Sequence, residues 1–375
     1  MNFSYDENQL DIKQLADKIF SELANDERQK LVDASGSRFD PELWQQLAES
    51  GLLGIAIDDS YGGMGFNFES LCLLIEEAGR YVAPVPAIHN LVSAAMPIQR
   101  YANDAIKEQY LGPIANGKTL VTATLANDNS LNAMQHSNGD WIIDGHISCV
   151  PYAVYAQAVL LSATSEQGLV ILLVELNADS KTLTLVEQQS TACEPWSQLN
   201  LQQHPIAAEN IIASGDKAAE CQAWAQQLTI AAQCAMATGL SDKMLRMTAA
   251  YTSQREQFGR PVATFQAVGQ RAADGFIDIE CLRLCTQEAI SLLSHSVDNS
   301  NQSVINEAVT IANIWCGDIC HRLSQSSQHL HGGIGVDRDY PLHRYCLWAK
   351  QLELSLGSSA SSLEQLGDQI AAEFA

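Results

Sequence analysis

The sequence predicts a mostly α-helical protein with a β-rich domain in the middle of the chain. Two stretches, residues 1–118 and 215–375, carry apolar residues three, four or seven positions apart, which is the spacing of one helix face. Between them, residues 119–214 contain short β-prone runs separated by clusters of turn residues. We therefore predict an N-terminal helical domain (1–118), a middle β-domain (119–214) and a C-terminal four-helix bundle (215–375).

The N-terminal domain is expected to begin with two helices, because its apolar residues follow a helical spacing at Leu10, Leu15, Ile19, Leu23 and Leu31. The run Asp40-Pro41-Glu42 predicts the start of another helix, with proline at its first position. A further helix is expected through Leu71–Tyr81, ended by Pro84 and Pro86.

The segment Tyr61–Gly65, Y-G-G-M-G, contains too much glycine for a helix and is expected to form a loop. A phosphate-binding loop is the functional alternative. However, no strand is expected before it and no Lys-Ser or Lys-Thr pair follows it, so a structural turn is the better interpretation.

The middle domain is expected to be a small sandwich or barrel, because short strands recur at close intervals. The β-prone runs are Leu120–Leu125, Trp141–Ile143, Ala158–Leu161, Leu169–Leu176 and Leu183–Val186. In the C-terminal domain only Pro261 and Pro341 interrupt the helical pattern. Its clearest apolar face is Ile305, Ala308, Ala312, Trp315, Ile319 and Leu323, and such faces are wide enough to serve an oligomer interface as well.

The stretch Tyr251–Asp274 is expected to be a corner between two long helices. Gly259 is placed to end the first helix, and Thr264 to cap the second. The second helix is expected to bury Phe265, Val268, Ala272, Phe276 and Ile279. The corner then presents Arg255, Gln257, Phe258 and Gln266 together, and donors beside an aromatic edge suit a diphosphate and an adenine. From residue types alone, a charged helix end beside a core phenylalanine is the favoured alternative.

Composition excludes several classes of function. A hydrophobic content of 46% with 17% charged residues is typical of a globular protein, and a net charge of -23 argues against nucleic acid and anionic membranes as partners. Neither a signal peptide nor a membrane-spanning run is found. The ten cysteines form no C-x-x-C pair and the histidines have no metal-ligand spacing, so we expect no metal and a cytoplasmic protein with reduced thiols.

Three ordered motifs resemble the acyl-CoA dehydrogenase family. The corner reads Q-R-E-Q-F-G-R-P-V-A-T-F-Q, similar to the family's R-x-x-F-G-x-P-[IV]-x-x-F-Q. A second motif, His329–Tyr345, reads H-L-H-G-G-I-G-V-D-R-D-Y-P-L-H-R-Y. A third spans Leu43–Gly79 and includes Y-G-G-M-G-F and I-E-E-A-G. The resemblance implies the fold of that family: a helical domain, a middle β-domain and a four-helix bundle.

The resemblance also implies a chemistry, FAD-dependent oxidation of the Cα–Cβ bond of an acyl-CoA, with an electron-transferring flavoprotein as acceptor. A glutamate removes the α-proton in this family. Of its two usual positions, one corresponds here to Leu356 and the other to Thr229, so both lack a carboxylate. Glu353 is a weak candidate in their place, ahead of Asp337 and Asp339.

The family's contacts to the flavin ring are missing as well. Its T-E-P segment corresponds to Ala126-Asn127-Asp128, and its W-I-[TS] segment to Cys149-Val150-Pro151, where proline removes a hydroxyl and a backbone N–H. By contrast, the residues that reach a neighbouring subunit's FAD in the family are kept. These are Arg255, Phe258, Gln266, Gly332 and Gly333, with His329 where glutamine is usual.

This division resembles the non-catalytic partner chain of heteromeric acyl-CoA dehydrogenases that act on steroid side-chain CoA thioesters. Three hypotheses follow. The chain is a subunit that completes a partner's FAD site in a heterotetramer, or a stand-alone homotetrameric acyl-CoA dehydrogenase with an atypical base, or a non-enzymatic scaffold of the same fold. The fold alone cannot choose among these hypotheses, because function resides in the site. We rank them in that order.

Overall fold

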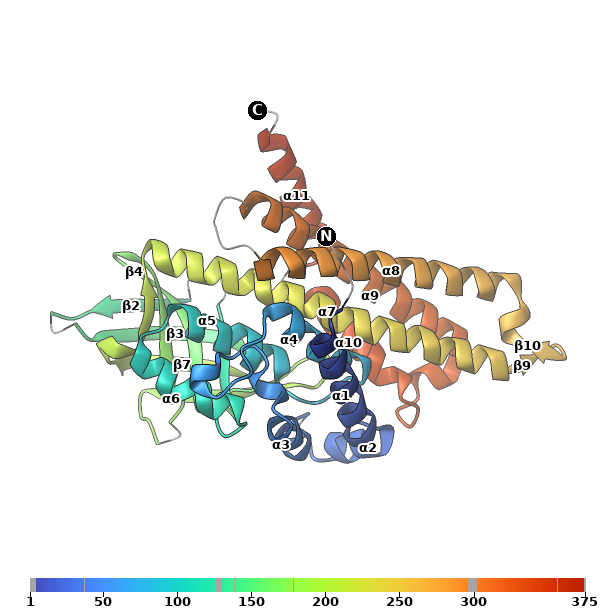
Figure 1. Cartoon of the computed structure of the whole chain (residues 1–375), viewed down its shortest axis with the longest axis horizontal. Coiled ribbons are helices and arrows are strands. Elements are labelled where there is room, and N and C mark those ends of the chain that lie inside the picture. Colours follow the sequence, from blue (N-terminus) through green and yellow to red (C-terminus); the bar gives the residue numbers. More distant parts are fainter. Residues whose placement is uncertain are drawn as a thin grey trace. The chain divides into compact units, whose positions relative to one another are not determined.

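The structure is a computed structural model that describes residues 5–36, 38–125, 130–137, 139–177, 179–295, 302–355 and 357–373 (Figure 1). The chain forms two compact units. Unit 1 contains Met1–Gln29, Cys72–Ala83 and Ile230–Ala375, and unit 2 contains Lys30–Leu71 and Pro84–Thr229. The bounds of the three predicted domains stay a prediction. A β-sheet domain lies between helical segments in the sequence, which confirms the predicted fold class.

Unit 1 is helical. Its main elements are α1 (Glu7–Leu23), α8 (Gln266–His295), α9 (Gln302–His331), α10 (Leu342–Leu354), α11 (Ser359–Glu373) and the second half of α7 (Asp216–Gln254). Helix α9 packs against α8, α10 and α11. All six residues of its predicted apolar face are at least partly buried, and five are fully buried. The second predicted opening helix is α2 (Asp26–Ala34), which begins in unit 1.

Within unit 1, α4 (Phe68–Arg80) and α7 approach each other at two glycines. A Cβ on Gly79 would lie 2.1 Å from the carbonyl oxygen of Met236, and a Cβ on Gly239 would lie 1.9 Å from that of Glu76. No side chain fits at such distances, so glycine is required at both positions. The close approach places the acidic end of α4 against α7.

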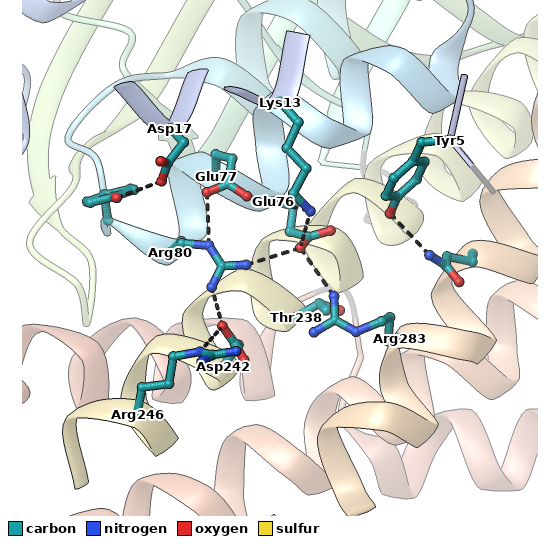
Figure 2. A network of polar contacts seen from close by, with 12 residues as sticks. Tyr5, Lys13, Asp17, Glu76, Glu77, Arg80, Thr238, Asp242, Arg246 and Arg283 are labelled. Atoms are coloured by element: carbon teal, nitrogen blue, oxygen red, sulfur yellow. Dashed lines mark hydrogen bonds and ion pairs between the residues drawn. The ribbon is translucent and has the colours of Figure 1, made fainter. Parts of the chain in front are cut away.

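A network of charged side chains surrounds this approach (Figure 2). Glu76 Oε1 accepts from Lys13 Nζ at 3.1 Å, from Arg80 Nη2 at 3.3 Å and from Arg283 Nη1 at 3.3 Å. Arg80 also contacts Glu77 at 2.9 Å and Asp242. Burial raises the pKa of the Glu77 carboxyl, and this effect outweighs the nearby cations. The network ties α1, α4, α7 and α8 together.

Two expectations about the corner are wrong. Helix α7 ends at Gln254, before Gly259, and the glycine instead lies in a hairpin turn. Thr264 does not cap α8, since its hydroxyl donates to the carbonyl of Pro261 at 2.7 Å inside a short 3₁₀ turn, η5 (Val262–Thr264). The predicted buried face of α8 is also wrong in part, because Phe276 is 59% exposed while Ile279 is buried. The spacing was helical, but the core lies on the face of Ile279, Leu282 and Thr286.

Unit 2 is built on a mixed eight-stranded sheet with the order β6-β7-β3-β2-β4-β5-β8, and β1 pairs with β4 in parallel. The strands are β1 (Val121–Thr124), β2 (Leu131–Gln135), β3 (Trp141–Pro151), β4 (Ala158–Ser165), β5 (Gly168–Glu175), β6 (Leu183–Gln189), β7 (Pro195–Ile206) and β8 (Ile211–Ser214). Its core is formed by apolar residues from most strands, including Ile143, Leu172 and Leu199. Strands β2, β7 and β8 were not predicted.

The rest of unit 2 is helical. It contains α3 (Pro41–Glu49), which begins at Pro41 as predicted and is capped by Asp40, a π-helix η3 (Ile88–Ala95), α5 (Met96–Tyr101), α6 (Asp104–Ala115) and the first part of α7. The loop at Tyr61–Gly65 folds back on its own chain, because a Cβ on Gly63 would lie 2.0 Å from the Ile57 carbonyl oxygen. This close packing explains the loop as a structural turn.

Candidate functional site

The corner after α7 is a two-residue β-hairpin. Strand β9 (Glu256–Gln257) pairs with β10 (Arg260–Pro261), and Phe258 and Gly259 form the turn with φ values of 55° and 75°. A turn with positive φ at both central residues matches the twist of a hairpin, and glycine adopts it freely. Phenylalanine does not, so Phe258 is held in a strained conformation. Phe258 is 91% exposed, and its ring lies edge-on to that of Phe265, at 6.3 Å between centroids.

Two polar side chains of this corner make no polar contact with the rest of the described chain. Arg255 and Gln266 are both exposed, and within the described part of the chain neither side chain has a hydrogen-bond or ion-pair partner. The neighbouring Arg260, by contrast, lies over the Phe265 ring at 4.2 Å. The corner therefore offers the guanidinium of Arg255, the amide of Gln266 and the aromatic face of Phe258 to an external group.

The second candidate segment lies at the end of α9, where a 3₁₀ turn, η7 (Gly332–Val336), begins. Gly332 has a φ of 63°, which favours glycine, and Gly333 has no such need. A Cβ on either glycine would meet nothing within 4 Å. The turn thus leaves its backbone open. It is linked to the corner by Tyr251 of α7 and His331 of α9, whose rings stack at 4.4 Å between centroids.

His329 lies nearby on α9, where its Nδ1 contacts the guanidinium of Arg271 on α8. Both side chains line a hollow of about 510 Å³ between the two helices, together with Asp274, Asp278 and Arg322. Arg322 forms two 3.0 Å hydrogen bonds with Asp278, so its charge is satisfied. Arg271 has no carboxylate partner among the described residues.

The two positions at which a base was expected hold none. Thr229 donates its hydroxyl to the Ala225 carbonyl at 2.7 Å and lies 2.9 Å from Ser93 Oγ, so Ser93 is the donor in that second bond. Leu356 lies outside the described residues. The nearest upstream carboxylate on α7, Glu220, accepts from Tyr101 Oη at 3.0 Å.

Glu353, the alternative candidate, is tied to two neighbours. It lies 2.5 Å from Lys350 Nζ and 3.0 Å from His321 Nδ1, and its side chain is mostly buried. The structure therefore brings Glu353 together with a cation from its own helix and a histidine from α9.

The segment Cys149–Pro151 uses its backbone donors inside unit 2. Cys149 N–H donates to Gln188 Oε1 at 2.9 Å, Pro151 has no N–H, and Tyr152 N–H donates to the Pro195 carbonyl at 2.7 Å. The Pro151 carbonyl accepts from Thr122 Oγ1 at 2.6 Å. The other expected ring segment, Ala126-Asn127-Asp128, lies outside the described residues.

Tyr152 is a site feature that the sequence did not reveal. It is fully buried with a φ of 53°, and its hydroxyl donates toward the Arg38 carbonyl at 3.2 Å and the Glu194 carboxylate at 3.1 Å. Burial raises the pKa of the Tyr152 phenol well above its usual value. His89 Nε2 lies 3.8 Å from Glu194, and burial lowers the pKa of that imidazole. The only signal in the sequence was the unusual run V-P-Y-A at Val150–Ala153.

The described part of the chain contains no helix long and apolar enough to span a membrane. In the same residues no group of three or more His, Cys, Asp or Glu side chains is arranged to hold a metal ion.

Comparisons with known proteins identify the family. Residues 6–118 match the acyl-CoA dehydrogenase N-terminal domain, and residues 224–371 match the acyl-CoA dehydrogenase C-terminal domain. Acyl-CoA dehydrogenase FadE27 of Mycobacterium tuberculosis is 31% identical over 375 residues, which cover 99% of each chain.

Two solved structures are similar over nearly the whole chain. One is the ChsE4–ChsE5 complex from Mycobacterium tuberculosis, with a TM-score of 0.91, 29% identity and 99% of both chains covered. The other is a variant of the Tcur3481–Tcur3483 steroid ACAD, with a TM-score of 0.88, 33% identity and 98% of both chains covered. The chain therefore belongs to the acyl-CoA dehydrogenase family of FAD-dependent oxidoreductases.

Proposed function

We propose that this chain is the non-catalytic subunit of a heterotetrameric acyl-CoA dehydrogenase. In this proposal its exposed corner completes the FAD site of a partner chain, which supplies the catalytic glutamate. The substrate is a CoA ester of a steroid side chain, and an electron-transferring flavoprotein accepts the electrons. The similarity to a two-component complex and to a steroid ACAD supports this assignment of partner and substrate class.

One contrast carries the proposal. Arg255 and Gln266, which would contact a partner's FAD, have exposed side chains without a hydrogen-bond or ion-pair partner among the described residues, whereas the described segment that would hold the chain's own flavin ring is satisfied internally. The Arg255 side chain has no hydrogen-bond or ion-pair partner among the described residues, and a Cβ on Gly333 would meet nothing within 4 Å. In contrast, the N–H groups of Cys149 and Tyr152 both donate within unit 2. Random loss of function would not be expected to separate the two sets.

Each residue of the corner has a chemical role in the proposal. The guanidinium of Arg255 can form charge-assisted hydrogen bonds with a diphosphate, and the exposed ring of Phe258 can pack against an adenine. Gln266 adds an amide donor, His329 an imidazole, and the glycines of η7 allow a ligand to approach the backbone. FAD, when bound, supplies the acceptor for the hydride that leaves the acyl chain.

The α-proton must be removed by a group other than Thr229 and Leu356, which occupy the two positions where the family carries its base. Thr229 is a hydroxyl committed to two hydrogen bonds, and a leucine at position 356 cannot accept a proton. Glu353 is paired with Lys350 and His321. These arrangements support a base supplied by the partner.

The stand-alone homotetramer remains the second candidate, with Glu353 as the base. Glu353 is the one carboxylate on α10, and it forms an ion pair with Lys350. The two candidates differ in where FAD binds. A stand-alone enzyme purifies with stoichiometric flavin, whereas the proposed subunit alone carries little or none.

The experiment is to purify the chain alone and together with its partner, and to record the flavin absorbance of each. We expect flavin only in the complex. Arg255→Ala should then reduce FAD occupancy at least about tenfold, because a charge-assisted contact contributes roughly 1.5–3 kcal/mol. Arg246→Ala is the control, since Arg246 is another exposed arginine and lies on α7, outside the hairpin.

Stoichiometric flavin on the isolated chain would overturn the proposal in favour of the stand-alone enzyme. Unchanged flavin content in the Arg255→Ala complex would remove Arg255 from the site. Comparing turnover of steroid side-chain and straight-chain acyl-CoA esters tests the substrate class. Faster turnover of the straight-chain ester would contradict the steroid assignment.

A further inference from the structure

Three aromatic rings connect the end of α7 with the end of α9. Tyr251 and His331 stack with centroids 4.4 Å apart and planes 16° apart. Tyr340, which follows η7, lies 5.3 Å from the His331 ring and 6.3 Å from the Tyr251 ring. Tyr251 lies 80 residues before His331 and 89 residues before Tyr340 in the sequence, and all three lie within one unit.

His331 is fixed in this cluster by a hydrogen bond on each ring nitrogen. Its side chain is buried, and its Nδ1 lies 2.8 Å from the Ser327 carbonyl, which can only accept. Nδ1 therefore carries the proton, and Nε2 is the acceptor in a neutral imidazole. Tyr340 Oη lies 3.2 Å from Nε2 and donates to it. Burial lowers the pKa of His331, in agreement with a neutral ring.

Both candidate segments are attached directly to this cluster. The N–H of Arg255 donates to the carbonyl of Tyr251 at 2.8 Å, and the carbonyl of Arg255 accepts from Val262 N–H at 2.8 Å. The hairpin thus begins from the turn of helix that carries Tyr251. On the other side, His331 immediately precedes Gly332. A movement of either ring would change the spacing between the hairpin and η7.

We infer that Tyr251, His331 and Tyr340 are positioning residues, which hold the Arg255 hairpin and the Gly332–Gly333 turn at the fixed spacing that a diphosphate-containing dinucleotide needs. This inference rests on the proposed function. A diphosphate contacted from two separate segments is bound well only when both are held in place before binding. The stacked pair provides that preorganisation, since among the described residues no hydrogen bond or ion pair joins the hairpin directly to the turn.

Four variants separate positioning from general stability. Tyr251→Phe keeps the stacked ring, and Tyr251→Leu removes it. Tyr340→Phe removes only the hydroxyl that holds Nε2 of His331. Tyr345→Phe is the control, because Tyr345 is also buried in unit 1 and loses one hydrogen bond, from Oη to the Arg80 carbonyl at 2.9 Å.

The measurements are amide exchange of residues 255–262 in the chain alone and FAD affinity in the complex with the partner. We expect Tyr251→Leu and Tyr340→Phe to speed exchange in the hairpin and to weaken FAD binding about three- to tenfold. Tyr251→Phe should restore both readouts to the wild-type values. Tyr345→Phe should lower the melting temperature and change neither readout.

Equal hairpin exchange in Tyr251→Leu and Tyr251→Phe would overturn the inference. The inference would also be overturned if Arg255→Ala strips the flavin but Tyr251→Leu leaves the FAD affinity unchanged. In that case the proposed function would stand without the positioning role. If neither Arg255→Ala nor Tyr251→Leu changes FAD affinity, the proposed function itself is wrong and the inference falls with it.

Discussion

Replacing Glu76 by glutamine tests whether the charge network of Figure 2 stabilises unit 1. The carboxylate is nearly buried, and its Oε1 accepts from Lys13, Arg80 and Arg283 at 3.1–3.3 Å. Glutamine keeps the shape and one acceptor oxygen but removes the charge. The substitution therefore isolates the electrostatic part of three contacts that join α1, α4 and α8.

The size of the effect follows from the partners that remain. A charge-assisted hydrogen bond is roughly twice as strong as a neutral one, so each of the three contacts loses about 1 kcal/mol. Each cation keeps another carboxylate, however: Glu77 for Lys13 and Arg80, and Glu280 for Arg283. We therefore expect the free energy of unfolding to fall by about 2–3 kcal/mol, below the 3–5 kcal/mol typical of breaking a fully buried pair.

Urea unfolding at fixed protein concentration measures this change through the midpoint and slope of the transition. Glu280→Gln is the matched control, because it removes a charge from the same network at a side chain that is 45% exposed. An exposed pair contributes about 0.2–1 kcal/mol. If the two variants lose the same stability within about 0.5 kcal/mol, the reasoning about the buried node is refuted.

Three further predictions concern the site and its environment. Gly333→Ala should leave the stability of the isolated chain almost unchanged, since its Cβ meets nothing within 4 Å, but weaken FAD binding in the complex; equal binding would show that nothing approaches that backbone. Glu353→Gln should leave turnover by the complex nearly intact. Losing a true base lowers the rate roughly 10²–10⁴-fold, so a loss of that size with flavin still bound would make Glu353 catalytic. Burial lowers the folded-state pKa of His89, His204 and His331 below 6.5. As the pH falls, the unfolded chain therefore binds more protons than the folded chain, and the urea midpoint should drop between pH 7.5 and pH 6. A constant midpoint would contradict this.

Periodicity predicted the helices well and the strands less well. The spacing of Ile305 to Leu323 marked the buried face of α9 correctly, because a long amphipathic helix repeats its signal over many turns. Strand β7 was missed because it begins with Pro195, has Pro205 near its end, and its alternation is broken by three consecutive polar residues, Gln202–His204. On α8 the helical period was correct but the buried face was not, since Phe276 and Ile279 fit the same spacing.

The candidate site could be found from the sequence only where residues lie close together in the chain. Arg255, Phe258 and Gln266 fall within one motif, and the resemblance identified them. The role of Gly259 was mistaken because a glycine after a helix suits a helix end and a hairpin turn equally well. The contact between Tyr152 and Glu194 joins residues 42 apart, and the stack of Tyr251 on His331 joins residues 80 apart, so no local pattern announces either.

The exposed ring of Phe258 has a consequence for how this protein is kept in a cell. An aromatic side chain on a protruding turn, flanked by Arg255 and Arg260, offers both a hydrophobic contact for chaperones and cleavage points for proteases with basic specificity. In the proposed assembly the partner covers this turn, so binding would protect the assembled copies and leave unassembled copies open to degradation.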